Sequence, residues 1–278
     1  MASTKSKKES RTFTFMKAVI LFLFVVAFNT SFSQEKKVLL NELSSEKMEA
    51  NQVLGVDKFG FLYYIKDNVF TKRKATKTFE YKNLSLGKIE KIDIQNPLKV
   101  ILFYKDFNTI ITLDSQLNEI QKVNFANNEK QIVAEATGIA SQNRFWIFNN
   151  LTQKIGLYDY LNNEFVEITQ AFQGNLKHYQ TTFNDFQWID EQLNWFDCSV
   201  FGKITKLGKV PDFDKMQIIS QNYLLFLKEN NLFLKDLKTQ ETQIIKKGDK
   251  TIESFFYNEE NLVIFTNQQI TIYKIILP

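Results

Sequence analysis

Apolar residues after position 36 follow the pattern of strands. Short runs rich in Ile, Val, Phe and Tyr are separated by Asn, Asp, Gln and Lys, and almost no long segment places apolar residues at helical spacing. Short runs of β-branched and aromatic residues bounded by turn-forming residues are typical of strands. The pattern therefore predicts an all-β protein.

The runs come in pairs, and the pairs repeat. In each pair a dense run, as expected for a strand buried on both faces, precedes a more alternating run, as expected for a half-exposed strand. The dense runs are centred on Tyr63, Leu102, Ile147, Trp195, Phe226 and Ile264 and lie about 40 residues apart on average. A four-stranded propeller blade repeats at about 40–45 residues.

We therefore predict a β-propeller of about six four-stranded blades in a single domain, residues 34–278. The last unit is one strand short, and residues 37–43 form an orphan run upstream of the first unit. We expect this N-terminal strand to complete the last blade, because ring closure removes open sheet edges. The fourth unit is irregular and shows no clear fourth strand after 203–207. A sandwich or barrel is the alternative all-β architecture.

At the level of this hairpin repeat, residues 37–278 resemble the divergent six-bladed propellers of exported bacterial proteins, of the NHL or TolB-like type. The chain has no WD dipeptide, kelch double glycine, YVTN run or Asp-box. The resemblance therefore implies an architecture and assigns no functional residues.

The first 33 residues have the layout of a secretory signal peptide. A basic segment precedes an apolar run of eleven residues, 18–28, and small residues at 31 and 33 precede Gln34. The run is shorter than the roughly 20 apolar residues that span a bilayer. We expect cleavage after residue 33 and a periplasmic or extracellular product without a membrane span. Met16 is an alternative start of the chain. A retained N-terminal anchor is the alternative.

Charge and composition narrow the partner classes. The full chain has a net charge of +4, but residues 1–33 hold five of the 35 basic and one of the 31 acidic residues, which leaves 30 of each in residues 34–278. A neutral domain whose only arginines are Arg73 and Arg144 gives no basis for nucleic-acid binding. One cysteine and one histidine exclude a disulfide framework and HExxH zinc chemistry.

No catalytic constellation is evident, so the chain is expected not to be an enzyme, although the sequence does not decide this. No GxSxG or phosphate-binding loop is present. His178 is interpreted as a surface-loop histidine. Cys198 follows Asp197, which would raise the pKa of the thiol, so a packed and inert cysteine is expected.

A propeller enzyme, such as a lactonase-like hydrolase or a lyase with a divalent ion in its channel, is the main alternative. Ca²⁺ and Mg²⁺ prefer oxygen ligands. Carboxylates on or near strands that would line the channel are Asp57, Asp93, Glu135, Asp185 and Asp190. No spacing singles these residues out, so no metal site and no cofactor is predicted.

Aromatic residues are the most unusual feature, with 27 Phe, 10 Tyr and 3 Trp. Several fall at the edges of the predicted strands, and aromatic side chains rimmed by polar groups are typical of interfaces. The candidate binding residues are Tyr179, Phe186, Trp188, Trp195 and, as a stacked or paired anchor, Arg144. Packing between blades is the alternative role for the rings.

The leading hypothesis is an exported, non-catalytic propeller that binds a protein partner, as a scaffold or accessory subunit of a cell-envelope or secretion assembly. A glycan-binding module, with Trp188 or Trp195 as a stacking platform, is a further alternative. The sequence leaves the partner, the binding face and the oligomeric state open.

Overall fold

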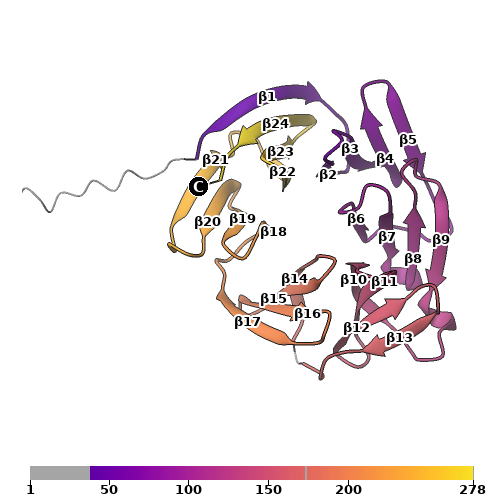
Figure 1. Ribbon diagram of the computed structural model, residues 1–278. Coiled ribbons are helices and arrows are strands. Elements are labelled where there is room, and N and C mark those ends of the chain that lie inside the picture. Colours follow the sequence, from indigo (N-terminus) through magenta and orange to yellow (C-terminus); the bar gives the residue numbers. More distant parts are fainter. Residues whose placement is uncertain (1–37, 173, 278) are drawn as a thin grey trace, which may run out of the picture. The chain divides into compact units, whose positions relative to one another are not determined.

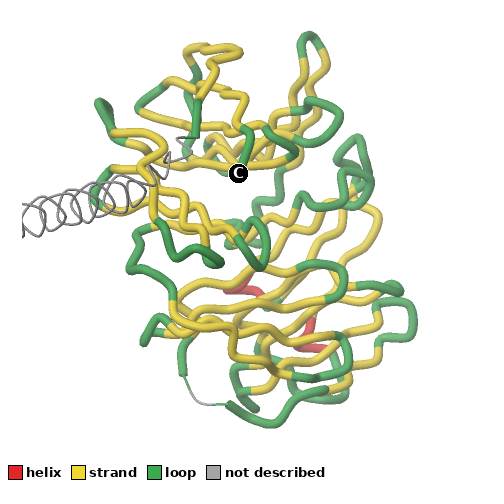
Figure 2. Tube along the Cα trace, turned by 60° about the vertical axis from the view of Figure 1, so that its left-hand side comes forward, coloured by secondary structure: helices red, strands yellow, loops and turns green. Residues whose placement is uncertain are grey.

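A computed structural model describes residues 38–172 and 174–277, apart from the Lys247 side chain, and shows six four-stranded antiparallel sheets in a ring (Figure 1). The prediction of an all-β propeller with six four-stranded blades is confirmed. Residues 38–277 form one compact unit. Within the described residues the only helical segments are two short 3₁₀ turns, η1 (Lys105–Phe107) and η2 (Phe125–Asn127), drawn in red in Figure 2.

The blades follow one another along the chain, and each runs outward from the centre of the ring. Blade 1 comprises β2 (Gln52–Val56), β3 (Leu62–Lys66), β4 (Val69–Lys74) and β5 (Lys77–Tyr81). Blade 2 comprises β6 (Lys91–Asp93), β7 (Val100–Tyr104), β8 (Thr109–Leu113) and β9 (Glu119–Asn124). Blade 3 comprises β10 (Ala134–Ala140), β11 (Arg144–Asn149), β12 (Lys154–Asp159) and β13 (Glu164–Glu167).

Blade 4 comprises β14 (Leu176–Thr181), β15 (Asp185–Asp190), β16 (Asn194–Ser199) and β17 (Ile204–Lys209). Blade 5 comprises β18 (Lys215–Ile218), β19 (Tyr223–Lys228), β20 (Asn231–Asp236) and β21 (Thr242–Lys247). Blade 6 comprises β22 (Ile252–Asn258), β23 (Asn261–Thr266), β24 (Gln269–Ile275) and β1 (Leu40–Lys47).

Strand β1 closes the ring by pairing antiparallel with β24, from Leu40 opposite Ile275 to Lys47 opposite Gln269, with one bulge between Glu42 and Ser44. The predicted closure by an N-terminal strand is confirmed, although the strand spans Leu40–Lys47 and not residues 37–43. All but its first residue are exposed, so backbone pairing, and not side-chain burial, holds it.

The hydrophobic core lies between the blades. In blades 2 to 6 the second strand is buried on both faces along its centre, whereas β3 of blade 1 is only partly buried, and alternate residues face opposite neighbours. In β7, Ile101 and Phe103 pack in one cluster with Ile147 of blade 3, whereas Leu102 and Tyr104 pack with Tyr63 of blade 1. Six such clusters fill the six gaps between neighbouring blades.

The predicted phase of the fourth blade is wrong. The run around Trp195 is the third strand, β16, and the doubly buried second strand is β15. The run at 203–207, predicted as the third strand, forms the fourth strand, β17. The centre of β15, Trp188, lies 41 residues after Ile147 and 38 before Phe226, which restores an even repeat. The polar Gln187, only 9% exposed, weakens the apolar run of β15, whereas Trp195 makes an alternating strand look dense.

The predicted signal peptide, residues 1–33, lies outside the described residues. Among the residues that are described, no helix has the length and hydropathy to cross a bilayer.

Deleting residues 38–47 should destabilise the entire domain, because it exposes the edge of β24 along the seven paired positions of β1. A chain starting at residue 34 is the reference. Net backbone hydrogen bonds contribute about 1 kcal/mol each, so the free energy of unfolding should fall by at least about 3 kcal/mol. Urea unfolding followed by circular dichroism measures this, and an unchanged midpoint would refute closure by β1.

Candidate functional site

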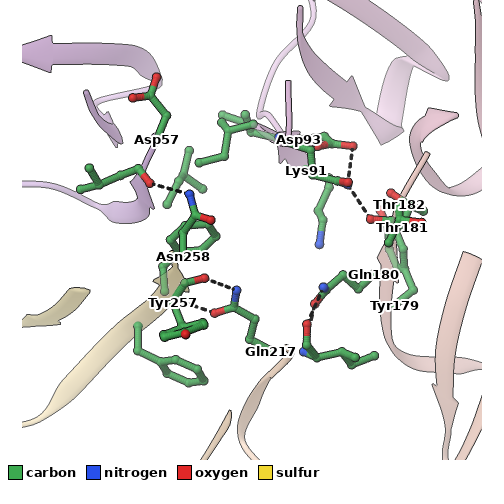
Figure 3. Close-up of a pocket in the computed structure, with 18 of the residues that line it drawn as sticks. Asp57, Lys91, Asp93, Tyr179, Gln180, Thr181, Thr182, Gln217, Tyr257 and Asn258 are labelled. Carbon is green, nitrogen blue, oxygen red and sulfur yellow. Dashed lines mark hydrogen bonds between the residues drawn. The ribbon is translucent and has the colours of Figure 1, made fainter. Parts of the chain in front are cut away.

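A cavity of about 710 Å³ occupies the centre of the ring (Figure 3). Its walls are the innermost strands of five blades, namely β2, β6, β14, β18 and β22, whereas β10 of blade 3 contributes only Thr137. The cavity continues into the turns that follow these strands, where Lys58, Gln95, Phe183 and Glu259 are exposed at its rim. A central concave site with both apolar and polar walls is a typical place for ligand recognition.

Two glutamine side chains tie the inner strands together. Gln180 of β14 donates from Nε2 to the carbonyl of Ile218 at 2.7 Å and accepts from the Ile218 amide at 3.0 Å. Gln217 of β18 makes the same two bonds to Tyr257 of β22, at 2.8 and 2.7 Å. Each primary amide thus replaces a missing strand partner, since neighbouring inner strands belong to different sheets. These bonds hold one wall of the cavity across blades 4, 5 and 6.

Two carboxylates of the cavity wall are saturated by protein donors. Asp57 accepts hydrogen bonds from the amides of Phe59 and Phe61, both at 2.9 Å, and from the Tyr63 hydroxyl at 2.8 Å. Asp93 accepts from the Ile139 amide of blade 3 at 2.9 Å and from the Gln95 amide at 3.0 Å. Burial raises the pKa of Asp93, and the two backbone donors oppose that rise. Both residues therefore have a structural role in their turns.

Lys91 differs from these groups. Its side chain extends from β6 into the open centre of the cavity (Figure 3), where Nζ lies 4.7 Å from the ring centre of Tyr179 on β14. Among the described residues it has no hydrogen-bond acceptor and no ion pair within 4 Å. Burial lowers the pKa of Lys91, against the raising effects of Asp93 and Glu90. Asp93 and Glu90 thus act on this ammonium from a distance, and neither forms an ion pair with it.

His178 precedes Tyr179 on β14 and also lines the cavity. The prediction that it lies in a surface loop is wrong. Its ring is half-buried and meets Phe213 edge-on, with 6.0 Å between ring centres. The Nε2 atom is inaccessible to solvent and has no hydrogen-bond partner. Burial, followed by the nearby positive charge of Lys91, lowers the pKa of His178 to about 3. The ring is therefore neutral at physiological pH.

The predicted aromatic binding residues are mostly core residues. Phe186, Trp188 and Trp195 are 0%, 3% and 2% exposed, so the expectation that they lie at a surface is wrong. Phe186 and Trp188 pack between blades 3 and 4, and Trp195 packs between blades 4 and 5. The physical reason is the altered phase of blade 4, which places these rings on its doubly covered strands. Tyr179 alone of the predicted rings lines the cavity, stacked on Phe186.

The remaining predicted residues lie apart from one another. Arg144 bonds from Nε to the Ser141 carbonyl at 3.0 Å. Glu135 pairs with Lys105, Asp185 contacts Thr182 in its own turn, and Asp190 caps the turn to Asn194. Of the five candidate metal ligands, the structure brings only Asp57 and Asp93 to the cavity. In the part of the chain that the structure describes, no three His, Cys, Asp or Glu side chains form a group able to hold a metal ion.

Cys198 is fully buried, as expected for a packed cysteine. Burial, and then Asp197 and Asp185, raise the pKa of its thiol to about 12.

Sequence patterns did not identify Lys91, Gln180 or Gln217 as residues of the cavity. Lysine and glutamine are common surface residues, and only their place on inner strands distinguishes these three. An i, i+2 alternation of polar residues on the first strand of each blade is the one signal that could have marked them.

Comparison with solved structures supports the fold and does not extend to function. The β-propeller domain of Cps50 (Swd1) from Myceliophteria thermophila matches with a TM-score of 0.57 at 8% identity, over 85% of this chain and 99% of that one. A member of the DUF4221 family from Bacteroides vulgatus matches with a TM-score of 0.56 at 7% identity, over 87% and 99%. Virginiamycin B lyase from Staphylococcus aureus, solved with quinupristin, matches with a TM-score of 0.53 at 12% identity, over 86% and 99%. No protein-family profile and no curated protein sequence matches the chain.

Replacing Gln217 with Leu should destabilise the domain by about 1–3 kcal/mol, because it leaves the amide and carbonyl of Tyr257 without partners. Gln180→Leu should act similarly. Gln52→Leu is the matched control, since Gln52 lines the same cavity but is exposed. Chemical unfolding of the three variants measures the differences, and equal effects of all three would show that the inter-blade amide bonds carry no stability.

His178, the only histidine of the chain, allows a direct titration. Its pKa is about 3 in the folded state and 6.5 in the unfolded state, so only the unfolded chain takes up this proton as the pH falls below 6.5. Uptake of this proton by the unfolded chain lowers the free energy of unfolding progressively as the pH falls from 6.5 toward 3. Above pH 6.5 the histidine is neutral in both states and this loss is absent. We expect the imidazole Cε1 proton signal in NMR to stay constant from pH 8 to 5. A titration midpoint near 6.5 in the folded protein would contradict the buried position.

Proposed function

We propose that this chain is an exported, non-catalytic propeller that binds a protein partner through one face of its ring. That face, called the loop face here, comprises the turns at 57–61, 94–99, 160–163, 182–184 and 200–203. Backbone hydrogen bonds between turns support its definition. The Val200 amide donates to Asn184 at 3.0 Å, and the Tyr160 amide donates to Asn143 at 3.2 Å. The first-to-second and third-to-fourth strand turns of a blade thus meet on one side.

The observation that best supports partner binding at the loop face is a set of large apolar side chains exposed on these turns. Phe201 is 91% exposed, Leu161 66%, Leu98 65%, Phe59 48% and Phe183 42%. Single exposed apolar residues are ordinary on soluble proteins. Here they come from four blades of the same face, and Phe183 also forms part of the cavity rim.

Polar groups stand between these apolar side chains. Lys58, Gln95 and Glu259 are exposed where the cavity reaches the loop face. Interfaces combine aromatic anchors with a polar surround that keeps the free protein soluble. A partner segment laid over the cavity mouth would cover Phe183 and the polar rim together. We therefore retain the prediction of a protein-binding role, but we assign it to the loop face and not to the buried tryptophans.

The proposed place of action is the cell envelope, or a secretion assembly. It rests on the basic segment and apolar run of residues 1–33, which lie outside the described residues. Their layout is typical of a cleaved export signal.

Site-specific photo-crosslinking in the native envelope tests the binding face. A benzoylphenylalanine in place of Phe201 or Phe183 should give one discrete crosslinked protein, which mass spectrometry identifies. The same probe in place of Phe107 is the matched control, because Phe107 is 47% exposed in the 3₁₀ turn between β7 and β8 on the opposite face.

Affinity for the identified partner then provides the second measurement. Phe201→Gln and Phe183→Gln should each weaken binding by about tenfold or more, as expected for aromatic anchors, while Phe107→Gln should leave it within about twofold. Crosslinks that arise equally from both faces, or affinity lost only with Phe107→Gln, would contradict the assignment of the loop face.

A further inference from the structure

We infer that the central cavity binds a small monocarboxylic acid with an apolar body, and that Lys91 is the residue that anchors its carboxylate. The anchor of this site lies inside the ring, whereas the proposed partner surface lies on the turns, and the two meet at the cavity rim, where Phe183 belongs to both.

Lys91 is placed for this role by geometry. β6 sits at the centre of the ring, and the side chain projects from it into the 710 Å³ space (Figure 3). Tyr179 supports the side chain with its ring at 4.7 Å from Nζ. No described acceptor lies within hydrogen-bond distance of the three N–H donors of Nζ. A half-buried ammonium without a contact partner is costly, and a carboxylate against Nζ would remove that cost.

The carboxylates of the cavity itself do not fill this position. Asp57 is saturated by two backbone amides and the Tyr63 hydroxyl. Asp93 is bound to the amides of Ile139 and Gln95. Glu90 and Glu259 are exposed. An external anion is thus the group that complements the free donors of Lys91.

The surroundings select a single negative charge. Among the described lining residues, Lys91 is the only cation that projects into the interior, since Lys58 is exposed and its Nζ lies over the ring of Phe59. The described lining holds no arginine, and the neighbouring Asp93 and Glu90 would repel a dianion more strongly than a monoanion. Phosphate groups are typically bound by arginine forks or several cations. A monocarboxylate matches the one available ammonium.

Part of the wall can receive an apolar body. The lining combines polar residues with partly exposed apolar side chains from several blades, including Leu54, Ile94 and Phe255. The amides of Gln180 and Gln217 are already engaged with the next blade, so they offer little to a polyhydroxylated ligand. A ring or short chain attached to the carboxylate would bury its surface here.

Phenylacetate is a probe of this class, and phenylacetamide is its neutral counterpart of the same shape. Binding of each to the folded domain, residues 34–278, is measured by protein NMR titration. We expect saturable binding of phenylacetate with shifts at β6, β14 and β22, and binding of phenylacetamide weaker by about tenfold, because a charged hydrogen bond is lost.

Lys91→Met removes the charge and keeps the length of the side chain. It should weaken phenylacetate by about tenfold and leave phenylacetamide unchanged, so that the preference for the anion disappears. Lys58→Met is the matched control and should preserve the preference. Unfolding midpoints of both variants verify that they are folded. No binding of phenylacetate, equal binding of acid and amide, or a preference that survives Lys91→Met would each overturn the inference.

Discussion

The structure depends on how the two ends of the ring of sheets meet. Every blade except the last takes its four strands from one continuous segment, which leaves an open edge at β24. Strand β1 covers that edge with residues more than 220 positions away in the chain. Because β1 buries almost no side chain, its role is to satisfy backbone groups. An unpaired edge is both unstable and open to association with other chains. Closure also fixes blade 6 against blade 1, where Ser254 bonds to the Val53 carbonyl at 3.0 Å.

Closure of the ring determines how the innermost strands around the central cavity can be held together. Inner strands of neighbouring blades belong to different sheets, so side chains must supply the bonds between them. Gln180, Gln217 and Asp93 do so, and each is thereby saturated. Lys91 is the charged side chain of the described wall that projects into the cavity without such a bond, and the neutral His178 Nε2 and Thr137 Oγ1 also lack partners. The same geometry sends the first turn of each blade to one face, where Phe59, Leu98 and Phe183 are exposed. The structural network and the proposed recognition surface are therefore built from adjacent residues.

The repeat, the blade number and the closing strand could be predicted from hydrophobic patterning, because each doubly buried strand leaves a dense run such as Val100–Tyr104. The phase of blade 4 could not, since Gln187 is polar yet buried and Trp195 lies on a third strand. Composition alone also cannot distinguish a core ring from an exposed one: Trp188, a predicted binding residue, is buried, whereas Phe201 is exposed. The lining of the cavity could not be predicted from the sequence for a further reason. Lys91, Thr137 and His178 belong to three blades, and only the curvature of the ring brings them together.

Hydrogen exchange measured by mass spectrometry, with and without the partner identified by crosslinking, tests the proposed binding at the loop face most directly. We expect protection of amides at 57–61, 182–184 and 200–203, with unchanged exchange at 105–108 and 150–153 on the opposite face. Protection confined to 105–108 and 150–153, with the loop face unaffected, would contradict it.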